Sequence, residues 1–335
     1  MKKNSSYEYI YDLYKKLDFF DSCMTYCLLE INSSKITTIS EAVDITKKAS
    51  VALQDIESDL EMPCVFDKVN EFMDENGINR ALKKSGVVTG FDIPYQAIIA
   101  HKIFIYKSHS IDGLDKKEWK ELYDMFEGFN PPCSYSRFKI PVQILACICR
   151  YLSGEDTSAT IKDEINTLEE YKKKLEELYA YHANSAFREF ISNSREGRVI
   201  VGQGAFSLDA IQLRIDNLRA RIITKRKDST ILERQLAIDF IDTLHRFNAK
   251  QIPSIVSMLM GCGFIKEFVD NRTIFRLWKS FNQSQAKLDK YYGVGRSAKS
   301  TTSYKYVYSD SVTERIESLR SFSYAFIQKV GLQGK

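Results

Sequence analysis

The 335-residue chain is 44% hydrophobic and 27% charged, which is a globular composition and excludes disorder as the dominant state. Its 15 glycines and 6 prolines lie below the roughly 23 and 17 that average usage would give, so all-β and doubly wound α/β folds are disfavoured. Residues 1–197 hold 25 basic and 32 acidic residues, whereas residues 198–300 hold 18 and 9. A basic C-terminal half favours a polyanionic partner, or attraction to the acidic half of the same chain or of a neighbouring copy.

Membrane, metal and cofactor binding are not indicated. No apolar run of 18 residues occurs, and the N-terminal segment has acids and tyrosines where a signal peptide needs apolar residues, so we expect a cytoplasmic protein without a membrane partner. The seven dispersed cysteines predict reduced, mostly buried thiols. The four histidines lack HxxxH or HExxH spacing, so we expect no metal and no other cofactor.

Helical periodicity dominates the N-terminal part. Apolar residues step by three or four over residues 7–31, with one polar break at Asp21. Thr38 and Glu41 form a capping-box pattern that opens a second helix through Leu60. Further helices are expected over 63–76, 78–85, 94–107, 115–126 and, beginning at Pro141, 141–153.

The central part predicts three long helices. Residues 157–192 contain no helix breaker and carry apolar residues at four-three spacing, interrupted by Lys172. Residues 208–222 and 232–247 continue the same spacing. We expect these three segments to lie antiparallel with coiled-coil-like packing.

The C-terminal part is again helical from Pro253, with a turn at Gly261 and Gly263. A flexible basic connector is expected at 293–303, one short strand at 304–308 and a last helix at 311–330. The sequence thus predicts an all-α, multi-helix bundle with long antiparallel helices in the centre and at most one or two short strands. The expected domains are an acidic helical domain (1–130), a long-helix bundle that is basic after 198 (131–293), and a flexible basic linker with a C-terminal helix (294–335).

A partial dinucleotide-binding pattern occurs in the segment RVIVGQGAFS. Gly202 and Gly204 follow a strand-like run and precede a helix, as in a βαβ phosphate loop. Ser207 replaces the third glycine, and no further βα units follow to build a parallel sheet. We therefore interpret the segment as an interhelical connection in which Ser207 is the N-cap.

A helix-turn-helix motif is a second possibility. Ser257 and Gly261 suit the first helix and the turn, but a recognition helix starting at Phe264 would place acids where apolar residues are needed. Moving that helix to residues 271–283 gives a good amphipathic helix with exposed basic residues but makes the turn too long. We therefore favour the alternative of two core helices joined by a glycine turn.

Basic residues with aromatic neighbours recur after residue 198, and such sets can bind phosphates and stack on unpaired bases. The alternative is an ordinary solvated helix face. The candidate nucleic-acid contacts are Arg219, Arg221, Lys225, Arg226, Lys227, Arg272, Arg276, Lys279, Arg296, Lys299 and Lys305.

Three classes of function remain open, and no catalytic residue can be named. We favour a non-enzymatic helical scaffold, assembly factor or adaptor that acts through a protein partner and self-associates as a homo-oligomer. The first alternative is a nucleic-acid-binding protein that uses residues 198–308. The second is an enzyme or nucleotide-binding factor whose site is assembled from scattered residues. Because no familiar housekeeping motif is present, a viral or mobile-element origin is our working hypothesis.

Overall fold

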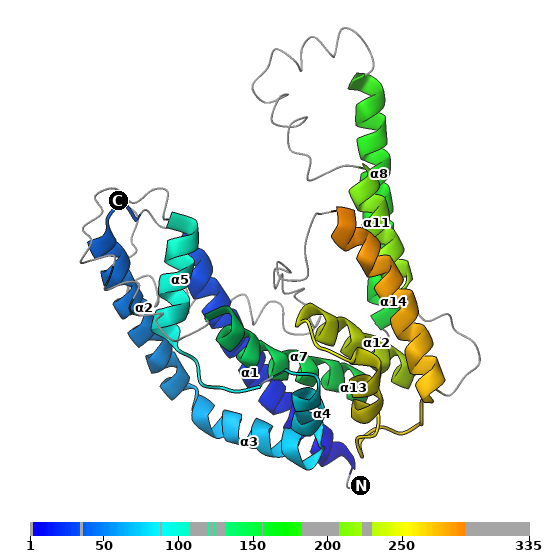
Figure 1. Cartoon of the computed structure of the whole chain (residues 1–335), viewed down its shortest axis with the longest axis horizontal. Coiled ribbons are helices and arrows are strands. Elements are labelled where there is room, and N and C mark those ends of the chain that lie inside the picture. Colours follow the sequence, from blue (N-terminus) through cyan, green and yellow to red (C-terminus); the bar gives the residue numbers. More distant parts are fainter. Residues whose placement is uncertain are drawn as a thin grey trace. The chain divides into compact units, whose positions relative to one another are not determined.

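The computed structural model describes residues 3–33, 36–87, 89–107, 120, 124, 131–155, 157–182, 208–222 and 230–291 (Figure 1). The predicted all-α fold is confirmed, since no residue in these ranges belongs to a β-strand. The described residues group into two compact units, one up to Cys149 and one from Arg150 onward. The predicted three-domain division stays a prediction, because much of the chain at its boundaries lies outside the described ranges.

The first unit is a helical assembly in which α1 packs against α3 and α5, and α2 packs against α5. A cluster of aromatic rings forms its centre. The ring of Phe20 from α1 meets Phe66, Tyr95 and Phe138 edge to face, at centroid distances of 6.2, 6.5 and 5.9 Å. The helices are α1 (Lys3–Ser33), α2 (Ile39–Asp59), α3 (Met62–Glu75), α4 (Ile78–Lys84), α5 (Tyr95–Lys107) and α7 (Pro131–Ser153), of which the residues from Arg150 onward belong to the second unit.

The predicted capping box opens α2. The backbone N–H of Glu41 donates to Thr38 Oγ1 at 3.2 Å, and the backbone N–H of Thr38 donates to Glu41 Oε2 at 3.1 Å. These two bonds satisfy donors that the first helical turn leaves unpaired. The polar break at Asp21 in α1 also has a partner, because the buried ammonium of Lys139 lies 3.4 Å from its carboxylate.

The predicted helix start at Pro141 is wrong. Helix α7 begins at Pro131 and passes through Pro141 to its predicted end at Ser153. A proline inside a helix cannot donate to the carbonyl four residues earlier, which here is Arg137 O. The backbone N–H of Gly90 donates to that carbonyl at 3.4 Å, so a loop outside the helix supplies the missing hydrogen bond.

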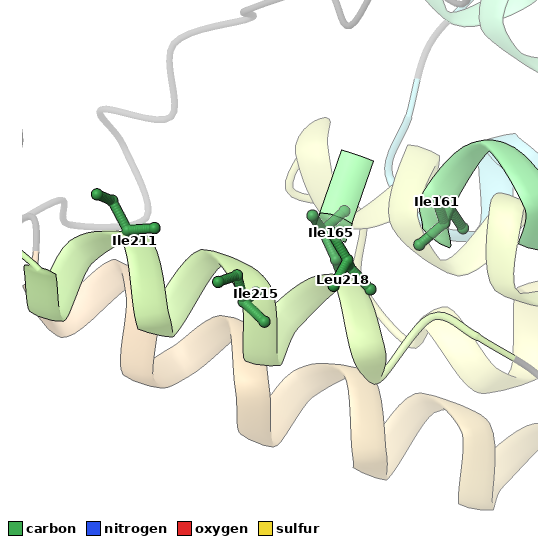
Figure 2. Packing of buried hydrophobic residues seen from close by; sticks show 5 residues of the cluster. All are labelled: Ile161, Ile165, Ile211, Ile215 and Leu218. Carbon is green, nitrogen blue, oxygen red and sulfur yellow. The ribbon is translucent and has the colours of Figure 1, made fainter. Parts of the chain in front are cut away.

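The second unit contains a pair of helices with the predicted apolar seam. Ile161 and Ile165 of α8 pack with Ile211, Ile215 and Leu218 of α11 (Figure 2). The polar interruption at Lys172 is matched by Gln212, whose Oε1 accepts a 2.9 Å hydrogen bond from the Lys172 ammonium. The helices are α8 (Thr157–His182), α11 (Leu208–Arg219), α12 (Ile231–Arg246), α13 (Ile252–Leu259) and α14 (Asn271–Tyr291).

The two helices of this seam run antiparallel, as predicted. Lys172, in the second half of α8, reaches Gln212 in the first half of α11. Leu218, near the end of α11, lies beside Ile165 in the first half of α8 (Figure 2).

The third helix of the predicted antiparallel set is a different one. Helix α14, and not α12, packs along α11, so that α8, α11 and α14 lie side by side (Figure 1). Helix α12 packs instead against α13 and α14. Its residues from Gln235 to Leu244 are all buried, including polar ones, so α12 is a central helix and not one strip of an amphipathic hairpin.

Several sequence-based predictions fall outside the described ranges. They concern the helix over 115–126, of which only residues 120 and 124 are described, the continuation of α8 to residue 192, and the glycine-bearing segment at 198–207. The connector at 293–303, the short strand at 304–308 and the helix at 311–330 also lie there.

The α8–α11 seam predicts a large loss of stability when one of its buried side chains is shortened. Ile215 is almost fully buried, so Ile215→Ala should lower the free energy of unfolding by about 2–5 kcal/mol through lost burial and a residual cavity. Urea unfolding followed by circular dichroism measures this loss. The control is Lys162→Ala, which replaces an exposed side chain of α8 and should change the free energy of unfolding by less than about 0.5 kcal/mol. Equal effects of the two changes would contradict the assigned seam.

Candidate interaction surfaces

Helix α14 is fixed at its start by an aspartate cap. The backbone N–H of Thr273 donates to Asp270 Oδ1 at 2.9 Å, and the Thr273 hydroxyl donates to Asp270 Oδ2 at 2.7 Å. These hydrogen bonds lower the pKa of Asp270, which therefore stays ionised at the positive end of the helix dipole. The cap sets the residue at which α14 begins.

One face of α14 is buried against two neighbouring helices. Ile274, Phe281 and Leu288, spaced seven residues apart, are the buried side chains of the helix. The ring of Phe281 meets His245 of α12 edge to face at 5.4 Å. On the side of α11, the Asn217 amide donates to Gln285 Oε1 at 3.0 Å. These contacts hold the opposite face of α14 toward solvent.

The outward face of α14 carries a row of cations that we call the basic stripe. Its members step by three, four or eight residues, all are exposed, and within the described part of the chain none of them forms an ion pair. Such steps place side chains on one side of a helix, here over a length of about 27 Å. The basic stripe consists of Arg272, Arg276, Lys279, Lys287 and Lys290.

Exposed aromatic rings adjoin the basic stripe. Phe275, between two of its cations in sequence, is 51% exposed, and its ring lies 5.5 Å from that of Trp278. Phe268, shortly before α14, is 79% exposed. Large rings in water are costly to solvate, so apolar surface next to unpaired charge is typical of a binding face.

The structure separates the cations that the sequence grouped as nucleic-acid contacts. Arg272, Arg276 and Lys279 lie together in the basic stripe. Arg219 is exposed but pairs with Glu169 at 2.5 Å. Arg221 is buried and pairs with Asp242, so its guanidinium does not reach the surface. Outside the described residues lie Lys225, Arg226, Lys227, Arg296, Lys299 and Lys305.

Sequence reasoning missed Lys287 and Lys290 as members of the basic stripe. The signal was present, because both continue the helical spacing from Lys279 through Gln283. The helix considered for the helix-turn-helix motif covers residues 271–283 and so omits both lysines, whereas α14 continues to Tyr291.

The helix-turn-helix spacing is not formed. Helix α13 ends at Leu259 and α14 begins at Asn271, so residues 260–270 separate them, where the motif uses roughly three or four. No helix starts at Phe264. The alternative placement of the second helix over 271–283 is confirmed, and with it the objection that the turn is too long.

The first unit exposes a face of opposite sign, which we call the acidic α3 face. Within the described residues no cation pairs with the carboxylates of this face, and Lys68 is the sole cation of α3. Asp74 accepts a 2.8 Å hydrogen bond from the amide of Asn79. The face consists of Asp67, Glu71, Asp74 and Glu75, all exposed.

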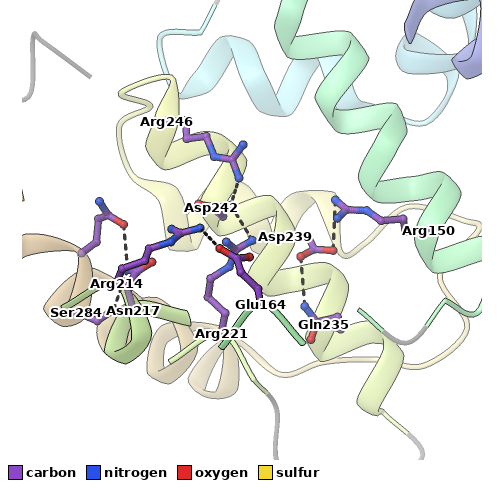
Figure 3. Close-up of polar contacts among 11 residues, drawn as sticks. Arg150, Glu164, Arg214, Asn217, Arg221, Gln235, Asp239, Asp242, Arg246 and Ser284 are labelled. Carbon is purple, nitrogen blue, oxygen red and sulfur yellow. Dashed lines mark hydrogen bonds and ion pairs between the residues drawn. The ribbon is translucent and has the colours of Figure 1, made fainter. Parts of the chain in front are cut away.

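A buried polar network centres on Asp242 of α12 (Figure 3). Arg221 lies 3.0 Å from its carboxylate, and Arg246 pairs with the same oxygen. Burial alone would raise the pKa of Asp242, but Arg221 and Arg246, with Arg214 further away, outweigh that effect and hold the pKa well below its usual range. Arg214 in turn pairs with Glu164 of α8 at 2.8 Å.

A second set of buried polar groups lies along the same helix. Arg150 lies 3.5 Å from the carboxylate of Asp239, which also accepts from the Gln235 amide at 3.3 Å (Figure 3). The Tyr151 hydroxyl donates to Glu233 Oε1 at 2.7 Å and accepts from the backbone N–H of Lys266 at 2.9 Å. Because each described carboxylate of α12 has a basic or hydroxyl partner here, we assign the network to holding the fold together.

Most of the described cysteines are buried, as the sequence predicted. Cys23, Cys27, Cys147, Cys149 and Cys262 are buried thiols, whereas Cys64 is exposed. Burial raises the pKa of the Cys27 thiol far above its ordinary value, with the neighbouring Cys23 adding to the effect, and burial raises that of Cys262 to about 11. Among the described residues, no group of three His, Cys, Asp or Glu side chains is arranged to hold a metal ion.

No known family model matches this chain, and neither a curated protein nor a solved structure gives a match. None of the helices in the described ranges combines the length and apolarity needed to cross a bilayer. The charged faces of α14 and α3 are therefore the features from which a function can be inferred.

The Asp242 network predicts a stability defect that depends on pH. Asp242→Asn leaves the buried Arg221 without its counter-charge and should lower the free energy of unfolding by about 3–5 kcal/mol. Since the folded-state pKa of Asp242 lies below its unfolded value, its carboxylate stabilises the fold above about pH 4, and this stabilisation is lost as pH falls through the folded pKa. The difference in free energy of unfolding between wild type and variant should therefore become smaller in acid.

Chemical unfolding at neutral pH and near pH 3 measures this difference. The matched control is Asp216→Asn, which removes a carboxylate that is about half exposed and lies 3.7 Å from Arg219, and it should cost less than about 1 kcal/mol. A loss for Asp242→Asn no larger than for this control would refute the structural role of the network.

Proposed function

We propose that the chain is a non-enzymatic helical scaffold or assembly protein that acts through protein–protein contacts and associates with copies of itself. The observation that carries this proposal is the pair of oppositely charged, exposed helix faces, the basic stripe on α14 and the acidic α3 face. Each is a row of charges that the described part of the same chain leaves without ion-pair partners. A chain with one such face of each sign is suited to repeated contacts between copies.

The exposed position of these charges determines how the contact should behave. Ion pairs between exposed side chains are weak singly and are screened by salt, but complementary rows steer association and suppress wrong partners. The basic stripe and the acidic α3 face would therefore set the rate and selectivity of association. The exposed rings of Phe268 and Phe275 would add apolar surface to be buried on contact.

This proposal predicts a salt-sensitive oligomer. At about 50 mM salt, where charges act over more than 10 Å, the intact chain should exceed its monomer mass of 38.7 kDa increasingly as its concentration rises. At about 500 mM salt the mass should return toward that of the monomer. Multi-angle light scattering after gel filtration measures both states. A strict monomer at high concentration and low salt would contradict self-association.

A second candidate function is nucleic-acid binding by α14. The observation that favours it is a row of five exposed cations, none of them ion-paired within the described residues, together with the exposed ring of Phe275 on the same helix. Cations in such a row can replace the counterions of phosphates, and an exposed ring can stack on an unpaired base.

This alternative predicts a steep dependence of single-stranded DNA affinity on salt. The slope of log K against log salt is negative, and each phosphate contact on a single strand contributes about 0.7 to its magnitude. Changing Arg272, Arg276 and Lys279 together to glutamine should therefore make the slope shallower by roughly two. Fluorescence anisotropy with a labelled oligonucleotide measures the slope. The control changes the exposed Lys162, Lys173 and Lys250 to glutamine. Absence of binding at low salt would eliminate the alternative.

A further inference from the structure

The charges on the two faces have matching spacings. On α3, Asp67, Glu71 and Asp74 are separated by four and then three residues. On α14, Arg272, Arg276 and Lys279 follow the same order of steps. Each triplet spans seven residues, which is about 10.5 Å along a helix axis.

We propose that the first three cations of the basic stripe dock along the acidic α3 face of a second copy of the chain. This inference rests on the proposed self-association and names the two surfaces that meet. With α14 parallel to α3, Arg272, Arg276 and Lys279 stand at the heights of Asp67, Glu71 and Asp74. With α14 antiparallel to α3, the two outer pairs still align. The middle pair is then offset by one residue, about 1.5 Å along the helix axis, which long side chains can span.

In the described part of the chain, both faces are exposed to solvent. All six residues are exposed, and within the described ranges none of them has an ion-pair partner. One cation of α3, Lys68, lies beside this face, 60° around the helix from Glu71, and within the described residues it forms no ion pair with the carboxylates of the face. The exposed Phe275 lies on α14 between the first two cations in sequence, so docking would cover its ring together with the charges.

A second copy explains more of the structure than a nucleic acid does. A nucleic acid would use the basic stripe alone and would be repelled by the acidic α3 face. A second copy pairs both faces with surfaces that the chain itself supplies. Because the two faces differ, the contact is heterologous, and each copy offers one free face of each sign to the next.

Charge reversal with exchange of partners tests the proposal. One variant carries Arg272→Glu, Arg276→Glu and Lys279→Glu, and a second carries Asp67→Lys, Glu71→Lys and Asp74→Lys. A third chain carries all six changes. The charge-matched control carries Lys162→Glu, Lys173→Glu and Lys250→Glu, three exposed cations of the second unit that lie outside the basic stripe.

Each triple variant alone should remain monomeric at the low salt and concentration at which the wild type associates, whereas the control should associate as the wild type does. An equimolar mixture of the two triple variants should regain the wild-type mass, because each then meets a face of opposite sign. The six-fold variant should also associate alone. Light scattering gives the masses, and circular dichroism with thermal unfolding verifies that each variant folds.

The outcomes separate this inference from the proposed function. If the wild type associates and the triple variants associate equally well, the inference is wrong and self-association stands. If the mixture fails to associate while the folded six-fold variant does, the faces do not meet between different copies as proposed, and the inference is overturned. Association that disappears after nuclease treatment would assign the basic stripe to nucleic acid. A wild type that never exceeds monomer mass overturns both proposals.

Discussion

The second unit depends on the neutralisation of one buried carboxylate. Asp242 lies in the most buried helix of the unit, where an unpaired charge would cost several kcal/mol, and Arg221 and Arg246 supply the compensating charge. Arg221 lies two residues beyond the end of α11, so this ion pair ties that end to α12. Arg214, on α11 itself, extends the network to Glu164 on α8. The orientation of α11, and with it of the helices packed along it, follows from these contacts.

This network divides the cations of the basic half into two kinds. The first kind forms ion pairs with carboxylates of the same unit and so contributes to the fold; it comprises Arg150, Arg214, Arg221 and Arg246. The cations of α14 face outward because Ile274, Phe281 and Leu288 occupy its inner face. Among the described residues after 198, the row of exposed cations without ion pairs lies on α14, so net charge by itself does not locate a binding face.

Periodicity predicted the helices of this protein well because an amphipathic stripe is a local property of the sequence. It identified Ile161, Ile165 and Ile215 as one seam, and the capping box gave the start of α2. Periodicity could not decide which helix would pack against α11, because the sequences of α12 and α14 both carry apolar residues at helical spacing. The start of α7 was misplaced because Gly90, whose backbone N–H donates to Arg137 O, is 47 residues away in sequence.

The candidate site was predicted only in part, for a related reason. A basic residue has the same appearance in sequence whether it meets a carboxylate inside the fold or remains exposed, as Arg221 and Arg272 illustrate. Salt distinguishes the two in solution, because exposed charges lose most of their interaction beyond a Debye length of about 10 Å at 0.1 M, whereas a buried pair is screened much less. The ionic strength that separates the charged faces should leave the pairing of Asp242 intact. Association and folding can therefore be measured independently on the same molecule.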